Sequence, residues 1–300
     1  FEAALQRFLG RDAELLTQAG ARAPELRGAP DWVRQLALAA DSFLFARPLP
    51  DLPEGESVIA GYPWFGDWGR DTMIALPGLT LATGRNEIAR RILLTFARFV
   101  DRGMLPNLFP AANEPLAYNT VDAALWYVEA WRAYVDASAD TEVLAEVFPV
   151  LREIIAWHAA GTRYGIGLDE ADGLLRAGEP GTQLTWMDAK IGDWVVTPRI
   201  GKPVEINALW YNALRIMARF AGQLGQSPTF YDDLADRARQ GFRRFVRPDG
   251  EGLFDVLDGP NGDDARIRPN QIFAVSLPHS PLDRTARRAL YGRLAGLRGG

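Results

Sequence analysis

Apolar residues recur at helical spacing along almost the whole chain, and this periodicity constrains the fold more than any other feature. Trp32, Val33, Leu36, Ala40 and Phe43 show the pattern, because residues three and four positions apart share one face of a helix. We predict helices over residues 1–20, 30–46, 71–83, 86–102, 120–137, 141–162, 204–224, 229–245, 270–276 and 283–297. Strand signals are confined to 57–60, 195–199 and the edges of long loops, so an all-α chain is expected.

Two kinds of helix alternate in this pattern. Residues 120–137 and 204–220 are apolar almost all round, whereas 86–102 and 229–245 each carry a face of arginines and aspartates. Buried and half-exposed helices in succession predict an inner and an outer ring of a helical toroid. A solenoid of helical hairpins is the alternative, but no residue-level repeat supports it.

Long polar and aromatic loops, over residues 103–118, 163–186 and 247–268, alternate with tight turns. Loops of this length inside a compact domain are usually functional. We expect them to leave one end of the toroid and to build one pocket together. Four basic residues of the loop regions are interpreted as solvated surface charges, with substrate contact as the alternative: Arg176, Arg199, Lys202 and Arg266.

The composition excludes several classes of protein. The 300 residues include no cysteine and two histidines, which leaves little material for disulfides, thiolate or histidine metal sites, or a histidine-dependent triad. A net charge of −5 with interspersed acids and bases gives no nucleic-acid footprint. No apolar run approaches the roughly 20 residues of a membrane helix. The lack of cysteine fits a reducing cytoplasm, and His158 and His279 are interpreted as structural or solvent-facing.

Residues 61–71, GYPWFGDWGRD, combine four aromatic side chains with two aspartates and one arginine. Burying such charges is costly unless each one is paired. A sugar, in contrast, stacks its C–H faces on aromatic rings and offers hydroxyl groups to carboxylates and guanidinium groups. The segment is therefore interpreted as the floor of a carbohydrate pocket, with these candidate substrate contacts: Trp64, Asp67, Trp68, Arg70 and Asp71.

Amides, carboxylates and aromatic residues recur where the later loops meet helices. The further candidate contacts are Asn119, Asp122, Trp186, Glu205, Asn207, Trp210, Asn270 and Gln271. Each has a structural alternative: Asp122 is equally suited to a helix N-terminus, and a core position is the favoured alternative for Asn207 and Trp210.

Asp188 differs from the other acids because Trp186 and Met187 precede it. An apolar wall disfavours the charged form of a carboxyl group, as a general acid near neutral pH requires. Ion pairing with Lys190 is the alternative, and it would favour the charged form instead.

Five motifs in this order, GYPWFGDWGRDTMIALPGL, YNTVDAALWYVEA, TWMDAKIGDW, PVEINALWYNAL and RPNQIFAVSLP, closely resemble the glucosidase domain of glycogen debranching enzymes, the amylo-α-1,6-glucosidase family. The resemblance covers residues 30–280. It implies an (α/α)6 toroid of the six-hairpin glycosidase type, related to the glucoamylase barrel, with residues 1–300 forming one glucosidase domain. The active site is expected at the end where loops lead into the inner helices.

Carried over to this chain, the resemblance makes Arg70 and Asp71 the residues that hold the distal hydroxyls of the terminal glucose, between walls formed by Trp64 and Trp68. It places the general acid at Asp188. The family's catalytic base belongs to a later segment, so the chain is expected to be incomplete at its C-terminal end. Glu205 is the best acid within the chain for a base or a substrate contact, and contact is favoured.

The reaction implied is hydrolysis of α-1,6-linked glucosyl stubs on a glycogen-like polymer, with inversion and without metal or organic cofactor. A branched α-glucan or oligosaccharide is the expected partner, with no nucleic acid or membrane, in the cytoplasm; an upstream domain of the same polypeptide is a further expectation. Two alternatives stay open: another toroid α-glucosidase, such as a glucoamylase or trehalase, and a non-catalytic glucan-binding module.

Overall fold

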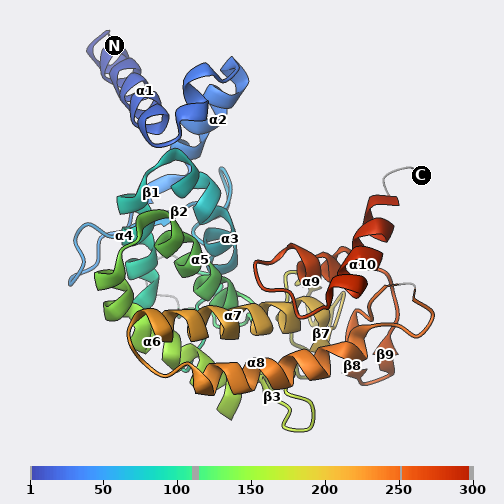
Figure 1. The fold of residues 1–300 in the computed structure, drawn as a ribbon. Helices are drawn as coiled ribbons and strands as arrows, with labels where there is room; N and C mark the ends of the chain where they lie inside the picture. Colours follow the sequence, from blue (N-terminus) through green and yellow to red (C-terminus); the bar gives the residue numbers. More distant parts are fainter. Residues whose placement is uncertain (1, 110–114, 251, 297–300) are drawn as a thin grey trace. The chain divides into compact units, whose positions relative to one another are not determined.

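The computed structural model describes residues 2–109, 115–250 and 252–296. Their backbone contacts divide the chain into two compact units (Figure 1). Unit 1 takes in the described residues of 1–99, 106–117 and 130–140, and unit 2 those of 100–105, 118–129 and 141–300.

Unit 1 is built mainly from helices. They are α1 (Glu2–Arg22), α2 (Asp31–Ser42), α3 (Gly69–Leu79), α4 (Asn86–Ala97) and the second part of α5 (Ala123–Ser138), with short 3-10 turns at Pro24–Gly28 and Leu81–Thr83. An antiparallel hairpin of β1 (Leu44–Ala46) and β2 (Glu56–Val58) sets Leu44 opposite Val58.

This hairpin corrects the predicted helix over residues 30–46. The helix ends at Ser42, and the following residues extend and pair with a strand that begins ten residues beyond Ala46. The backbone N–H of Ile59 also donates to the carbonyl of Phe43, at 2.9 Å. The local helical pattern is overridden because the backbone finds its partners in β2.

The core of unit 1 lies under α4 and the residues around Phe109. Helix α4 buries Ala89, Ile92, Leu93 and Phe96, which are spaced as one helical face, so its predicted amphipathic character is confirmed. Phe96 and Phe109 pack edge to face, with 5.0 Å between ring centroids. This packing ties Phe109 to the buried face of α4.

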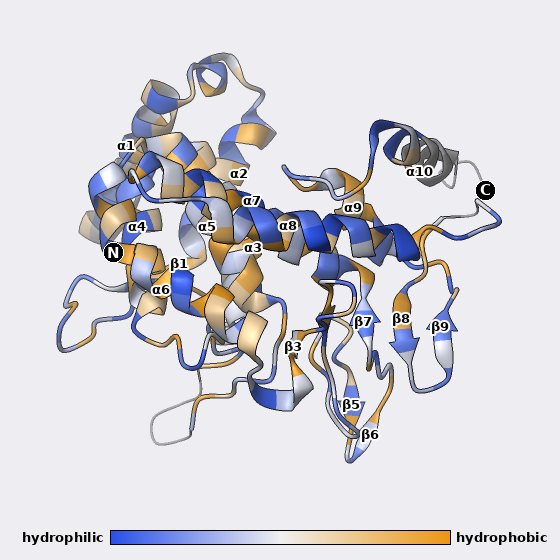
Figure 2. Cartoon of the chain, turned by 60° about the horizontal axis from the view of Figure 1, so that its bottom comes forward, coloured by the Kyte–Doolittle hydropathy of each residue, from blue (hydrophilic) through white to orange (hydrophobic). Residues whose placement is uncertain are grey.

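Unit 2 contains the first part of α5, then α6 (Thr141–Ala160), α7 (Val204–Gln223), α8 (Thr229–Phe242), α9 (Phe273–Ser276) and α10 (Arg284–Gly296), with 3-10 turns at Arg163–Gly165, Arg243–Phe245 and Pro269–Ile272. Its strands are all short: β3 (Gly167–Leu168), β4 (Leu175–Arg176), β5 (Lys190–Ile191), β6 (Trp194–Val195), β7 (Lys202–Pro203), β8 (Val256–Gly259) and β9 (Gly262–Asp264). β3 and β4 form an antiparallel hairpin. β5 and β6 form a second one, and β7, β8 and β9 form an antiparallel sheet in that order (Figure 2).

Helix α7 is the core of unit 2. Sixteen of its twenty residues are buried, whereas the helix beside it, α8, buries one face that includes Leu234, Ala238 and Phe242 (Figure 1). The prediction of an apolar inner helix followed by a half-exposed one is confirmed for this pair.

Lys202 ties three parts of unit 2 together. Its ammonium nitrogen lies 2.8 Å from Asp169 Oδ2, 2.8 Å from Asp172 Oδ2 and 2.7 Å from Asp258 Oδ2. Arg244 binds two of these carboxylates, those of Asp172 and Asp258. Strand β7, the turn at 169–172 and strand β8 are thereby held by one buried lysine, so its interpretation as a solvated charge was wrong.

Candidate active site

The aromatic segment, residues 61–68, forms a tight loop in unit 1 that precedes α3. The N–H of Phe65 donates to the carbonyl of Gly61 at 3.0 Å, and that of Ala60 to the carbonyl of Gly66 at 2.8 Å. Trp64 is 85% exposed, and the rings of Tyr62 and Phe65 are exposed as well. These rings are therefore available for stacking rather than committed to a core.

Asp67 has a different position from its neighbours. It is buried, and its carboxylate accepts from Nη2 of Arg47 at 2.5 Å and from the hydroxyl of Ser57 at 2.8 Å. Arg47 also lies over the ring of Phe109, 4.9 Å from its centroid. Because both oxygens of Asp67 have partners inside unit 1, the structure makes it the anchor of the aromatic segment and does not support its interpretation as a substrate contact.

Arg70 and Asp71 lie in the first turn of α3, after Trp68 in extended conformation at the N-cap. Arg70 is buried and Asp71 is exposed. The N–H of Gly69 donates to the carbonyl of Asn107 at 3.0 Å, which brings residues 107–109 beside this turn.

Three buried polar atoms near this turn lack a hydrogen-bond partner among the described residues. They are Nε1 of Trp68, Oγ1 of Thr72 and Oδ1 of Asn107. A buried polar atom left unpaired costs about 1–3 kcal/mol, so such atoms mark positions where a ligand hydroxyl or a water gains binding energy. Asn107, in the long loop over residues 103–118, therefore joins the candidate contacts.

The acid segment, residues 185–188, lies in unit 2. Nε1 of Trp186 donates to Oδ1 of Asn270 at 2.8 Å, and Nδ2 of Asn270 lies 3.6 Å from Sδ of Met187. The N–H of Met187 donates to Oγ1 of Thr185 at 3.3 Å. Asp188 follows directly and is partly exposed, while the ammonium of Lys190 donates to the carbonyl of Gly181 at 3.2 Å.

A backbone hydrogen bond brings another candidate segment beside the acid segment. The N–H of Val121 donates to the carbonyl of Leu184 at 2.9 Å. Asp122 is buried and accepts from the hydroxyl of Thr120, which itself caps the N–H of Ala123 at 3.3 Å. Oδ1 of Asn119 is buried without a partner among the described residues. Within unit 2, Asn119 and Asp122 therefore neighbour the segment that carries Asp188.

Four charged residues bind one another close to the acid segment. We call them the charge hub: Arg199, Glu205, Asp255 and Arg268. Nη2 of Arg199 donates to Oε2 of Glu205 at 2.7 Å, and Nε donates to Oδ2 of Asp255 at 3.0 Å. Arg268 binds the same aspartate. Nδ2 of Asn270 donates to Oδ1 of Asp255 at 2.7 Å, which joins the hub to the acid segment.

The hub bears on two expectations. Glu205 is 1% exposed and both of its oxygens bind Arg199, so its position in the first turn of α7 favours a structural role over a substrate contact or a base. Burial raises the pKa of Glu205, against the attraction of Arg199. Arg199 is likewise buried, not solvated.

Three remaining candidates have structural positions. The side-chain amide of Asn207 is hydrogen-bonded to the backbone of Leu175. Trp210 is fully buried and stacks on His158, with 6.2 Å between ring centroids. Oε1 of Gln271 accepts from the N–H of Leu253 at 3.1 Å. For Asn207 and Trp210, the core alternative is the one that the structure supports.

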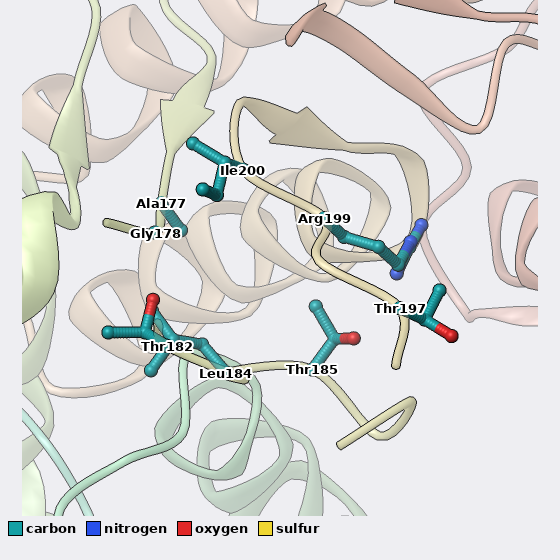
Figure 3. A pocket seen from close by; sticks show the side chains of 8 residues that line it. All are labelled: Ala177, Gly178, Thr182, Leu184, Thr185, Thr197, Arg199 and Ile200. Carbon is teal, nitrogen blue, oxygen red and sulfur yellow. The ribbon is translucent and has the colours of Figure 1, made fainter. Parts of the chain in front are cut away.

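A small cavity of about 10 Å³ separates the acid segment from the loop between β6 and β7 that carries Arg199 (Figure 3). It is lined by Ala177, Gly178, Thr182, Leu184, Thr185, Thr197, Arg199 and Ile200. This volume suits one water molecule and no sugar, so the cavity belongs to the support of the acid segment.

Sequence reasoning did not find the ion pairs that Asp255 makes with Arg199 and Arg268. The only local signal is that Arg199 and Glu205 flank the start of an apolar helix, where unpaired charges are costly.

In the described part of the chain, no helix combines the length and the apolar character needed to cross a membrane.

Comparisons with known proteins give the family. Residues 38–294 match the family model described as amylo-alpha-1,6-glucosidase. A glycogen debranching enzyme of Saccharomyces cerevisiae is 30% identical over 220 residues, which is 54% of this chain and 14% of that protein. The chain thus spans about a seventh of the length of this relative.

Two solved structures show the fold. A GH63 mannosylglycerate hydrolase from Thermus thermophilus matches with a TM-score of 0.65 at 15% identity, over 88% of this chain and 77% of that one. A GH78 rhamnosidase of a Bacillus species matches with a TM-score of 0.55 at 16% identity, over 71% of this chain and 21% of that one. These likenesses confirm the predicted all-α fold class of the (α/α)6 toroid glycosidases. With its family match across 38–294, the chain belongs to the amylo-alpha-1,6-glucosidase family.

Proposed function

We propose that this glycoside hydrolase domain removes α-1,6-linked glucosyl stubs from a branched, glycogen-like α-glucan by an inverting acid and base mechanism. The acid segment is the observation that carries the proposal: Trp186 is fixed through its indole nitrogen, and the partly exposed Asp188 follows two residues later. The family match and the similarity to a glycogen debranching enzyme support the choice of substrate.

Asp188 is proposed to protonate the leaving glycosidic oxygen. Arg70 and Asp71 are proposed to bind substrate hydroxyls, and the exposed ring of Trp64 to stack on a sugar face. Inversion also requires a carboxylate roughly 6.5–9.5 Å from the acid to activate water. Glu205 does not fit this role because Arg199 holds both of its oxygens.

The single family match runs through both units, which supports the proposal of one glucosidase domain. We also propose a cytoplasmic location, because a chain without cysteine suits a reducing compartment.

The substrate proposal is tested by incubating the full-length protein with a branched limit dextrin, maltose, trehalose and isomaltose, and following the anomer of released glucose by NMR. We expect the limit dextrin to be the preferred substrate and β-glucose to appear first. Preference for maltose or trehalose would establish the alternative of another toroid α-glucosidase, and α-glucose as first product would reject inversion.

The role of Asp188 is tested separately with Asp188→Asn. We expect hydrolysis to fall by about 10²–10⁴-fold, as is typical for loss of a general acid, while retention on a glucan affinity gel is preserved. Asp193→Asn, at the exposed turn of the β5–β6 hairpin, is the matched control and keeps wild-type turnover. Glucan retention without hydrolysis by the wild-type protein would favour the binding-module alternative.

A further inference from the structure

We propose that Asn270 is a positioning residue: it transfers the fixed geometry of the charge hub to Trp186 and Met187, and thereby sets the place of Asp188. This inference rests on the proposed role of Asp188 as the general acid. It differs from the expectation that Asn270 binds substrate, because its side chain is 1% exposed and its amide is bonded within the protein.

The direction of these hydrogen bonds fixes the amide of Asn270. A carboxylate only accepts and an indole N–H only donates. Between Asp255 and Trp186, the amide therefore satisfies both neighbours in a single orientation, with Nδ2 toward Asp255 at 2.7 Å and Oδ1 toward Trp186 at 2.8 Å. The hub thus fixes the position of Oδ1 of Asn270, which accepts the hydrogen bond of the Trp186 indole.

The hub itself is largely buried and held by several hydrogen bonds. The side chain of Asp255 is 1% exposed and accepts from Arg199, Arg268 and Asn270. Arg199 in turn binds Glu205 in the first turn of α7, the core helix of the unit. A chain of charge-assisted bonds, which are stronger than neutral ones, therefore links the acid segment to the best-buried helix of unit 2.

The acid segment needs such support because packing alone does not hold it. Trp186 is 44% exposed, so a large part of its ring has no protein neighbour. Asn270 contacts both residues that precede Asp188, Trp186 through Oδ1 and Met187 through Nδ2. Loss of this amide releases both at once, and a displacement of about 1 Å at a reacting group can cost 10²-fold in rate.

The first test compares Asn270→Ala, Trp186→Phe and the double variant of the full-length protein on the limit dextrin. Asn270→Ala should lower kcat by about 10²-fold with KM changed less than about threefold. The double variant should be no slower than the slower single variant, because both substitutions remove the same bond. An unchanged kcat for Asn270→Ala, or two independent losses that multiply, would overturn the proposal.

A matched control separates positioning from stability. Asn212 is also fully buried in unit 2, where its Nδ2 donates to Glu129 at 2.8 Å and its Oδ1 accepts from the N–H of His279 at 3.0 Å. Asn212→Ala should lower the unfolding temperature while keeping kcat within about twofold of wild type. Equal losses of kcat in the Asn212 and Asn270 variants would make the effect merely structural and reject the proposal.

A second pair of variants tests the direction of the bonds. Asn270→Asp sets two carboxylates against each other and should be slower than wild type by about 10²-fold. Adding Asp255→Asn supplies an amide that donates to the new carboxylate at position 270, and this carboxylate still accepts from the indole of Trp186. The double variant should therefore have a kcat at least about tenfold higher than Asn270→Asp alone. No recovery in the exchanged pair would contradict the assigned directions.

An NMR measurement tests the role of Asn270 without relying on hydrolysis of a glucan. The indole N–H resonance of Trp186, assigned by its loss in Trp186→Phe, should shift and exchange faster with water in Asn270→Ala than in Asn212→Ala. An unaltered resonance rejects the role of Asn270 whether or not the protein hydrolyses glucans. An altered resonance in a protein inactive on all four substrates supports the bond while the proposed function fails.

Discussion

Asn207 pairs with the backbone of Leu175 as a neighbouring strand residue would. Its Oδ1 accepts from the N–H of Leu175 at 2.7 Å, and its Nδ2 donates to the carbonyl of the same residue at 3.0 Å. Nδ2 also donates to the carbonyl of Pro203, one turn earlier, at 3.0 Å. One buried amide thus completes the hydrogen bonds of β4 and joins it to the start of α7.

Substituting Asn207 by alanine should destabilise the protein by about 2–4 kcal/mol, because two buried backbone groups of Leu175 lose their partner. Urea unfolding followed by circular dichroism measures this change. Asn261→Ala, at an exposed position of the turn between β8 and β9, is the control and should stay within about 0.5 kcal/mol of wild type. A similar small effect at Asn207 would show that the amide is dispensable.

Removing Glu205 should leave Arg199 with one buried partner in place of two. Breaking a buried ion pair from one side typically costs about 3–5 kcal/mol, so Glu205→Ala should lower the midpoint of urea unfolding strongly. The pair of Arg266 and Asp264 provides the comparison, since Arg266 is 71% exposed and exposed pairs contribute about 0–1 kcal/mol. If Arg266→Ala and Glu205→Ala were equally stable, the hub would not be a structural support.

His158 makes stability depend on pH. It is fully buried, and burial lowers its pKa from 6.5 to about 4. Nδ1 lies 2.8 Å from the carbonyl of Ile154, which only accepts, so Nδ1 carries the proton of the neutral ring. Between pH 6.5 and 4 the unfolded chain binds a proton that the folded chain does not.

This contribution to stability is complete above pH 6.5 and is lost as pH falls to 4, by about 3 kcal/mol in total. Unfolding free energies measured across this window should fall less steeply in His158→Phe than in wild type. NMR titration of the ring in the folded protein should give a midpoint near 4, and a midpoint near 6.5 would refute this account.

Asp67→Asn should loosen the aromatic segment, because the charge that binds Arg47 is removed while the size of the side chain is kept. We expect a loss of about 1–3 kcal/mol in stability and weaker retention on a glucan affinity gel, since the exposed ring of Trp64 is no longer held in place. Trp64→Ala should weaken retention without the loss in stability. Unaltered retention in Asp67→Asn would separate the segment from glucan binding.

The helical pattern was readable because it is local. Periodicity alone identified the apolar helix α7 and the amphipathic helices α4 and α8. It failed at residues 43–46, where the strand partner comes from residues 56–58 and no local pattern reports it.

Charged residues were harder to interpret than apolar ones. Asp67 and Glu205 have the chemistry of sugar contacts, and their structural use depends on Arg47, twenty residues away, and on Arg199. Asp255 lies still further along the chain. A sequence shows which charges exist, but the cost of burying them is met by partners that only the fold brings near.

The three ion pairs of Lys202 have a consequence for how unit 2 responds to chelators. A bound cation that joined Asp169, Asp172 and Asp258 could dissociate or be extracted by a chelator. The ammonium of Lys202 is part of the polypeptide and is regenerated with every chain that is synthesised. The contact between the turn at 169–172, strand β7 and strand β8 therefore forms without a metal ion and does not depend on the metal concentration of the solution.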